Sequence, residues 1–145
     1  MKLFVTLSKK TLCVILGLLV ISLIILGQLF TVKAGGIDGS TNAIRLEYIA
    51  GLGYSADETA VSVKEIVIPE NFSDVYLKYN RLQQNAGFDL ERYKGSRACV
   101  YTYRISDGED TVINLIVSDN KIIGGDISSV RIDGEMKALE RKKNV

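Results

Sequence analysis

The hydrophobic pattern divides the chain into one long apolar run and a series of shorter periodic segments. Residues 11–32 carry no charged side chain, and a helix of that length spans about 33 Å, close to the ~30 Å hydrocarbon core of a bilayer. The run exceeds the roughly 7–15 residues of a signal-peptide core. This favours an uncleaved membrane anchor, with cleavage near Ala34 as the alternative. We therefore expect a transmembrane helix over residues 11–32, after a cytoplasmic tail of residues 1–10.

The charges on either side of this run predict its orientation. Lys2, Lys9 and Lys10 precede it and Lys33 follows it, and an excess of lysine favours the cytoplasmic side. We expect a single-pass protein of the cell membrane, with its N-terminus in the cytoplasm and its C-terminal domain outside. Residues 33–41 are rich in glycine and predict a flexible linker that keeps this domain close to the bilayer.

Two segments beyond the linker have the apolar spacing of amphipathic helices. Thr41 and Ser73 can cap their N-termini, and glycines can end them. We expect one helix from residue 42 to residue 51 or 53, and another from residue 74 to about residue 85. The stripe expected to bury the second helix comprises Val75, Tyr79, Leu82 and Ala86.

Four further segments have the β-branched or alternating composition of strands. They are residues 61–68, 97–105, 111–118 and 121–128. The last three are joined by short turns, the tightest at Asp119-Asn120, and predict a β-meander. The element order predicts an α+β domain over residues 42–136, followed by a charged tail over residues 137–145. We expect two helices packed on one face of a four-stranded antiparallel sheet, in the order α-β-α-β-β-β.

Composition narrows the chemistry that this domain can perform. The chain has 18 basic and 17 acidic residues, and its first 33 residues hold four lysines and no acid. The remainder therefore carries 18 − 4 = 14 basic and 17 acidic groups, a net charge of −3, which argues against a nucleic-acid partner. The chain has no histidine, which removes histidine-dependent nucleophiles and most zinc sites.

The remaining reactive groups each have a structural interpretation. Cys99 lacks a histidine base, although Arg97 could lower its pKa, and it alternates with Tyr101 and Tyr103 as a core residue would. Gly124-Gly125-Asp126 lies in a strand with no helix after it, so it predicts a bulge or a close backbone approach rather than a phosphate cradle.

An acidic turn is the other candidate. Asp107, Glu109 and Asp110 could bind a hard cation, but their spacing differs from that of an EF-hand and is typical of a solvated turn. We therefore predict no catalytic, cofactor-binding or metal-binding residue, and no cofactor. The segment 87–95 is the candidate interaction surface, through Asp89, Arg92 and Tyr93, because arginine and tyrosine often anchor binding surfaces.

Five short motifs between residues 41 and 136 together resemble an uncharacterised family of small membrane-anchored bacterial proteins, a domain of unknown function (DUF4830). They are Ile68-Pro69-Glu70, Tyr79-Asn80-Arg81-Leu82-Gln83, Gly87-Phe88-Asp89-Leu90 with Tyr93-Lys94-Gly95, Tyr101-Thr102-Tyr103 and Gly124-Gly125-Asp126. The chain departs from the family pattern at Tyr54, where a tryptophan is expected. The resemblance implies a bacterial envelope protein and supplies no activity.

These observations favour a membrane-tethered extracytoplasmic module that binds an envelope component or a membrane protein and catalyses nothing. Its expected partners are the lipid bilayer, through residues 11–32, and an unidentified protein or envelope component. The alternative is an envelope enzyme that uses paired carboxylates on a cell-wall or lipid-linked substrate. A third interpretation makes the transmembrane helix itself the functional part, as a small subunit of a membrane complex.

Overall fold

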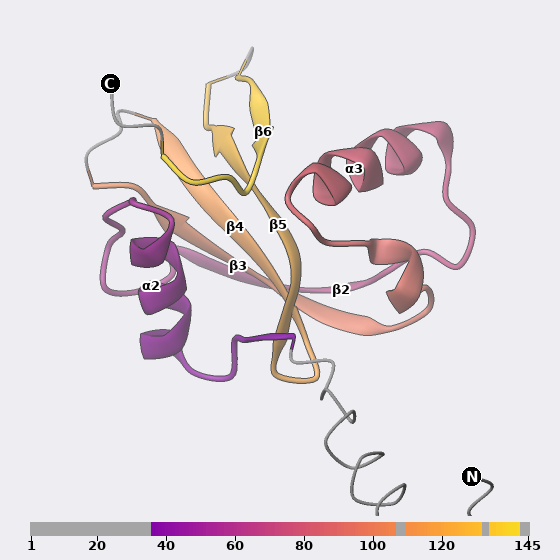
Figure 1. Ribbon diagram of the computed structural model, residues 1–145, viewed down its shortest axis with the longest axis horizontal. Coiled ribbons are helices and arrows are strands. Elements are labelled where there is room, and N and C mark those ends of the chain that lie inside the picture. The colour runs from indigo at the N-terminus through magenta and orange to yellow at the C-terminus, as the bar shows by residue number, and fades with distance from the viewer. Residues whose placement is uncertain (1–35, 107–109, 132–133, 143–145) are drawn as a thin grey trace, which may run out of the picture. The chain divides into compact units, whose positions relative to one another are not determined.

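The computed structural model describes residues 36–106, 110–131 and 134–142, which belong to one compact unit beginning at Gly36 (Figure 1). The cytoplasmic tail and the membrane helix predicted over residues 1–32, and the first three residues of the predicted linker, lie outside the described residues. In the ranges that are described, no helix has the length and apolar character needed to cross a bilayer.

Both predicted helices are confirmed. Helix α2 spans Asn42–Gly51 and helix α3 spans Asp74–Asn85. Each begins at the predicted cap: the hydroxyl oxygen of Thr41 accepts the N–H of Ile44, and that of Ser73 accepts the N–H of Tyr76. These bonds satisfy backbone donors that have no partner within the helix. A short 3₁₀-helix, η1, follows α3 at Leu90–Tyr93.

Within the described residues, the sheet has six strands and is antiparallel throughout. They are β1 (Ile37–Asp38), β2 (Ser62–Val67), β3 (Arg97–Arg104), β4 (Thr111–Ser118), β5 (Lys121–Ser129) and β6 (Met136–Ala138). The strand order is β1-β5-β4-β3-β2, and β6 also pairs with β5. Strands β3, β4 and β5 form the predicted meander. Asp119 and Asn120 adopt positive φ values of 46° and 61° in the tight β4–β5 turn, as a two-residue hairpin requires.

The predicted number of strands, four, was wrong. Strand β1 lies inside the predicted linker, and most of β6 lies inside the predicted charged tail. Both pair with β5, where Ile37 lies opposite Ile122 and Ala138 lies opposite Asp126. Segments of two or three residues are too short to show an alternating pattern. They became strands because the backbone edge of β5 was available to them.

The predicted packing of both helices on one face was also wrong, because α2 and α3 cover opposite faces of the sheet (Figure 1). Ile49 of α2 packs with Tyr103, Ile113 and Leu115, which are odd-numbered residues of β3 and β4. Leu90 of η1 and the tyrosines of α3 pack instead on Ala98 and Ile116, which are even-numbered. Successive side chains of a strand point to opposite faces. We call these two sides the α2 face and the α3 face.

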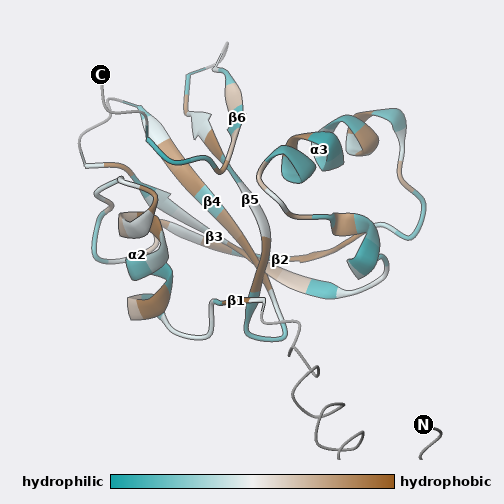
Figure 2. Ribbon diagram, viewed as in Figure 1, coloured by the Kyte–Doolittle hydropathy of each residue, from teal (hydrophilic) through white to brown (hydrophobic). Residues whose placement is uncertain are grey.

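The sequence of β4 contains the signal for this arrangement. Its apolar residues run almost continuously, as Val-Ile and Leu-Ile-Val, instead of strictly alternating. Such a run is typical of a strand that is buried on both faces. Figure 2 accordingly shows hydrophobic residues concentrated on β4 and the adjoining part of β5, whereas α3 is mostly hydrophilic.

The buried stripe of α3 differs from the predicted one by one position. Val75, predicted to be buried, is 77% exposed. The face that contacts the sheet carries Tyr76 and Tyr79 together with the buried polar residues Asn80 and Gln83. Two of the inward positions of α3 are polar, so the spacing of its apolar residues does not identify its buried side.

Candidate functional site

The polar residues of α3 attach it to the elements around it. The Asn80 side chain makes two hydrogen bonds. Its carbonyl oxygen accepts the N–H of Leu90 at 2.8 Å, and its Nδ2 donates to Asp89 Oδ1 at 3.1 Å. Oδ1 of Asp89 also accepts the N–H of Glu91 at 3.1 Å, so that Asp89 caps η1. Asn80 therefore fixes the position of η1 beside α3.

One helical turn further on, Gln83 reaches the backbone of β5. Its Oε1 accepts the N–H of Gly125 at 2.7 Å. A Cβ atom at Gly124 would lie 2.8 Å from that oxygen, and one at Gly125 would lie 2.2 Å from the carbonyl oxygen of Asn114. The β4–β5 register also shifts by one residue next to these glycines. The close approach and the bulge predicted for Gly124-Gly125 are both confirmed.

Asp126 is a buried carboxylate on the α3 face. It is 3% exposed and accepts hydrogen bonds from the Tyr79 hydroxyl at 2.9 Å, from Asn114 Nδ2 at 2.9 Å and from the Ser128 hydroxyl. Burial, and then the Asp126 charge, raise the pKa of Tyr79. These bonds join α3 to the centre of the sheet. Residues from three of the five motifs that carry the family resemblance thus lie in contact around α3 and have structural roles there.

The three residues predicted as an interaction surface lie together beside α3, and each has a contact within the fold. The hydrogen bond from Asn80 is the largest of the causes that lower the pKa of Asp89. Tyr93 packs against the core on the α3 face. Arg92 is exposed, and its Nε lies 3.7 Å from Asp89 Oδ2. Their binding role stays a prediction.

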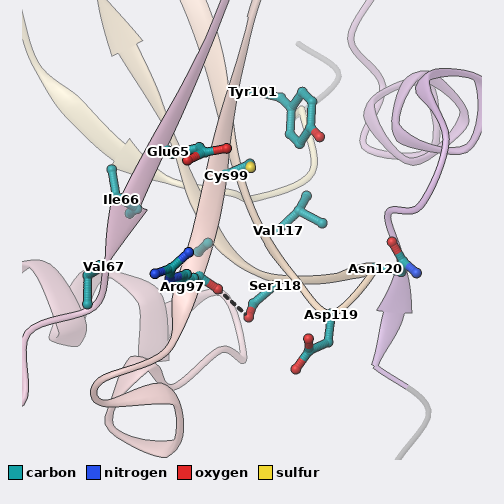
Figure 3. Close-up of a pocket in the computed structure, with 11 residues that line it drawn as sticks. Glu65, Ile66, Val67, Arg97, Cys99, Tyr101, Val117, Ser118, Asp119 and Asn120 are labelled. Atoms are coloured by element: carbon teal, nitrogen blue, oxygen red, sulfur yellow. Dashed lines mark hydrogen bonds between the residues drawn. The ribbon is translucent and has the colours of Figure 1, made fainter.

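A groove on the α2 face offers a different candidate site (Figure 3). Helix α2 covers only part of this face, and the part beside the β4–β5 turn is left as a hollow of about 710 Å³. Strands β2, β3 and β4 form its floor through Val67, Cys99, Tyr101 and Val117. A volume of this size lies within the ~300–1,000 Å³ of ligand-binding pockets. We call it the β2–β4 groove.

Charged side chains and exposed valines surround this floor. Glu65 lies on β2, Arg97 at the start of β3, and Asp119 in the turn after β4. The turn is fixed in place, since Ser118 donates its hydroxyl to the carbonyl oxygen of Arg97 at 2.7 Å. Val63 and Val67 on β2 are 57% and 61% exposed. Apolar residues left uncovered on a strand mark a surface that the fold itself does not use.

Cys99 lines this groove and is half-buried, so the prediction that it is a core residue was wrong. The residue lies on the same face as Tyr103, which is fully buried under α2. Alternation predicted the shared face correctly. It could not predict where along the strand the covering helix would end.

Arg45 is a buried residue with a structural role that the sequence analysis did not predict. It is 7% exposed on the inner side of α2 and has no ion pair within the described part of the chain. Its Nε donates to the Tyr103 hydroxyl at 2.8 Å, and one terminal nitrogen donates to the carbonyl oxygen of Gly39 at 2.7 Å. Its guanidinium lies 3.7 Å over the ring of Tyr101, where a cation–π contact stabilises it. The only sequence signal is its position four residues before Ile49.

The acidic turn is only partly within the described residues, which include Asp110 but not Asp107 or Glu109. In the ranges that the structure covers, no group of three acidic or cysteine side chains is placed to hold a metal ion.

Comparison with known proteins supports the resemblance of the motifs. No curated protein and no solved structure shows significant similarity to the chain. A family model described as "Domain of unknown function (DUF4830)" matches residues 48–127, from the last turn of α2 to a point within β5. This match covers more than half of the sequence and includes the motifs around α3 and Gly124-Gly125-Asp126. The chain belongs to the DUF4830 family.

Proposed function

We propose that the domain is a non-catalytic binding module and that the β2–β4 groove is its binding surface. The uncovered floor of the groove is the observation that supports this proposal. Elsewhere the α2 face is covered by α2, and the α3 face is covered by α3 and η1. On this face β2 leaves Val63 and Val67 more than half exposed, and Val67 lines a hollow beside the β4–β5 turn that is large enough for a ligand or a peptide.

The charged groups of the groove suit a surface that binds a partner. Glu65 lies on β2 and Asp119 follows β4, with β3 between these two strands. Arg97 lines the groove as well, so the surface presents charges of both signs to a partner.

We further propose that the module is tethered to the outer side of the cell membrane by residues 11–32. The uncharged run and the lysines before it support this placement. Strand β1 begins at Ile37, so three residues separate it from Lys33, and the four steps of a fully extended chain from residue 33 to residue 37 span only about 14 Å. A partner of the groove would then lie close to the bilayer surface.

Photo-crosslinking from full-length protein in native membranes tests the binding surface. A photoreactive phenylalanine analogue replaces Val63, on the groove side of β2, or Val75 on the outer side of α3, both exposed valines. We expect a discrete crosslinked product from position 63 and none from position 75. Val67→Arg, which places a bulky charge on the groove floor, should abolish the product from position 63. Identical products from both positions, or a product unaffected by Val67→Arg, would contradict the proposal.

A separate experiment tests the membrane tether. The full chain carries a C-terminal tag, and intact protoplasts that contain it are treated with protease. Membrane-bound protein whose tag is digested from outside supports the tether. A tagged product released into the medium and shorter by about 34 residues would show cleavage near Ala34 instead.

A further inference from the structure

One edge of the sheet is covered and the other is open. On the β5 side, β1 pairs with Lys121 and Ile122, and β6 pairs with residues 126–128. Between these two short strands, Gln83 accepts the N–H of Gly125. Strand β2 forms the opposite edge and pairs only with β3 among the described residues. Uncovered edge strands are templates for pairing with another chain.

The direction of the β2 backbone groups follows from the register. Ile68 donates its N–H to Ser96 and accepts the N–H of Gly95, so both of its backbone groups point toward β3. Groups alternate along an antiparallel ladder, so Ser62, Lys64 and Ile66 also point toward β3. The N–H and C=O groups of Val63, Glu65 and Val67 therefore point away from the sheet. Their side chains lie on the groove side of β2.

Charges beside this edge define what could pair with it. Glu65, Arg97 and Asp119 have no ion pair within the described part of the chain. Glu65 is central among the three outward-pointing residues, between two exposed valines. In a strand added to β2, the residue opposite Glu65 shares its face, and an opposite charge there stabilises the pair. Apolar residues opposite Val63 and Val67 would cover the valines and extend over the groove.

A second copy of the chain fits this edge poorly. A two-fold pairing of β2 with itself that uses all three outward-pointing residues places Glu65 opposite its own counterpart. Shifting the register by one step places Lys64 opposite its counterpart in one direction. In the other direction it places Glu65 opposite the apolar side chain of Val67, which leaves the carboxylate without a partner of opposite charge. Like charges directly opposite each other destabilise a strand pair. The edge therefore suits a partner whose central residue is basic.

Building on the binding module proposed above, we propose that β2 accepts an extended peptide segment of a partner protein as an additional antiparallel strand. The segment carries Lys or Arg opposite Glu65 and apolar side chains opposite Val63 and Val67. Backbone hydrogen bonds supply its affinity, and the three inward side chains supply its specificity, as in other cases of strand addition.

The test measures the binding of a labelled peptide, Thr-Val-Thr-Lys-Thr-Val-Thr, to the full chain in phosphatidylcholine nanodiscs, with empty nanodiscs as the reference. One version carries N-methyl groups on Val, Lys and Val, whose N–H groups would face β2. A matched version carries three N-methyl groups on the two inner threonines and the C-terminal threonine, whose N–H groups would face solvent. We expect the first to weaken binding at least tenfold and the second to change it by less than about twofold, since only the first removes hydrogen bonds of the ladder.

A charge exchange tests the specificity. Replacing the peptide lysine with glutamate should weaken binding about fivefold, and Glu65→Lys in the protein should restore it and reverse the preference. Glu65→Gln, which keeps the shape of the side chain, should reduce the difference between the two peptides.

The outcomes separate this inference from the proposed function. If both N-methylated peptides bind equally while Val67→Arg abolishes binding, the groove binds but strand addition is wrong. If no peptide binds and the crosslink from position 63 is absent as well, both proposals fail. If the full chain is instead a dimer in nanodiscs that Glu65→Gln stabilises, β2 pairs with a second copy and the inference is overturned.

Discussion

Removing the hydroxyl group of Tyr79 should destabilise the domain by an amount that the structure allows us to work out. Tyr79→Phe keeps the ring, which packs on the α3 face, and deletes only the donor that lies 2.9 Å from Asp126 Oδ2. Asp126 is 3% exposed, so water cannot easily replace the lost bond. Hydrogen bonds to charged groups contribute about 1.5–3 kcal/mol, and we expect a loss of about 2 kcal/mol in the free energy of unfolding.

Tyr76→Phe is the matched control. Tyr76 lies on the same helix one turn earlier, and its ring contacts Phe72 and Tyr79 at centroid distances of 4.5 and 5.9 Å. Its hydroxyl has no hydrogen bond among the described residues. The same chemical change at this position should alter stability by less than about 0.5 kcal/mol.

Urea unfolding followed by tyrosine fluorescence measures both variants. The chain has no tryptophan and all seven tyrosines follow residue 47, so the signal reports the folded domain and not the predicted membrane segment. For a domain of this size, a loss of about 2 kcal/mol lowers Tm by about 10 °C. Equal losses in the two variants, or no loss in Tyr79→Phe, would refute the role assigned to the bond with Asp126.

The pH dependence of stability gives a second measurement on the same pair. Burial, followed by the Asp126 charge, raises the pKa of Tyr79, so the folded domain keeps this proton where the unfolded chain releases it. The contribution of the protonated Tyr79 to the free energy of unfolding is complete below pH ~10. Above that pH it decreases by up to about 1.4 kcal/mol per pH unit for one proton. Tyr79→Phe should show a shallower decrease. Some decrease remains, since burial also raises the pKa of Tyr48 and Tyr76.

Three further substitutions test other parts of the fold by the same urea assay. Arg45→Lys should cost about 1–3 kcal/mol, because an ammonium group cannot reproduce the planar contacts with Tyr103 and the neighbouring backbone; an unchanged midpoint would contradict this. Gly125→Ala should cost about 3 kcal/mol or more, since its Cβ would lie 2.2 Å from the backbone oxygen of Asn114, and a stable variant would show that the bulge can rearrange. Val75→Glu should change stability by less than about 0.5 kcal/mol, because the side chain is 77% exposed; a large loss would restore the stripe predicted from sequence.

Local signals in the sequence predicted the local structure well. The caps at Thr41 and Ser73, the Asp119-Asn120 turn and the Gly124-Gly125 irregularity are all confirmed. Each depends on a few neighbouring residues and on backbone conformations that only certain side chains favour. Such preferences act within a few residues and can be read from the sequence.

The candidate site was not predicted, although its residues were visible. The apolar residues of segment 61–68 change phase between Val63 and Ile66, a pattern that in a sequence indicates a bulge or a strand buried on both faces at one end. The β2–β3 ladder is in fact regular across these residues. Ile66 packs toward the α3 face, whereas Val63 and Val67 are exposed on the groove side. An apolar residue on an exposed surface and one in a core look alike in a sequence.

The sequence by itself determined the α+β class, both helices with their caps, the meander and the family. Tertiary structure alone decided that α2 and α3 cover opposite faces, that Asn80, Gln83 and Asp126 are buried, and that β2 remains an open edge. The physical reason is that burial depends on what another part of the chain covers. Periodicity shows which residues share a side, but the length and position of the covering helix decide which of them reach solvent and are free to bind a partner.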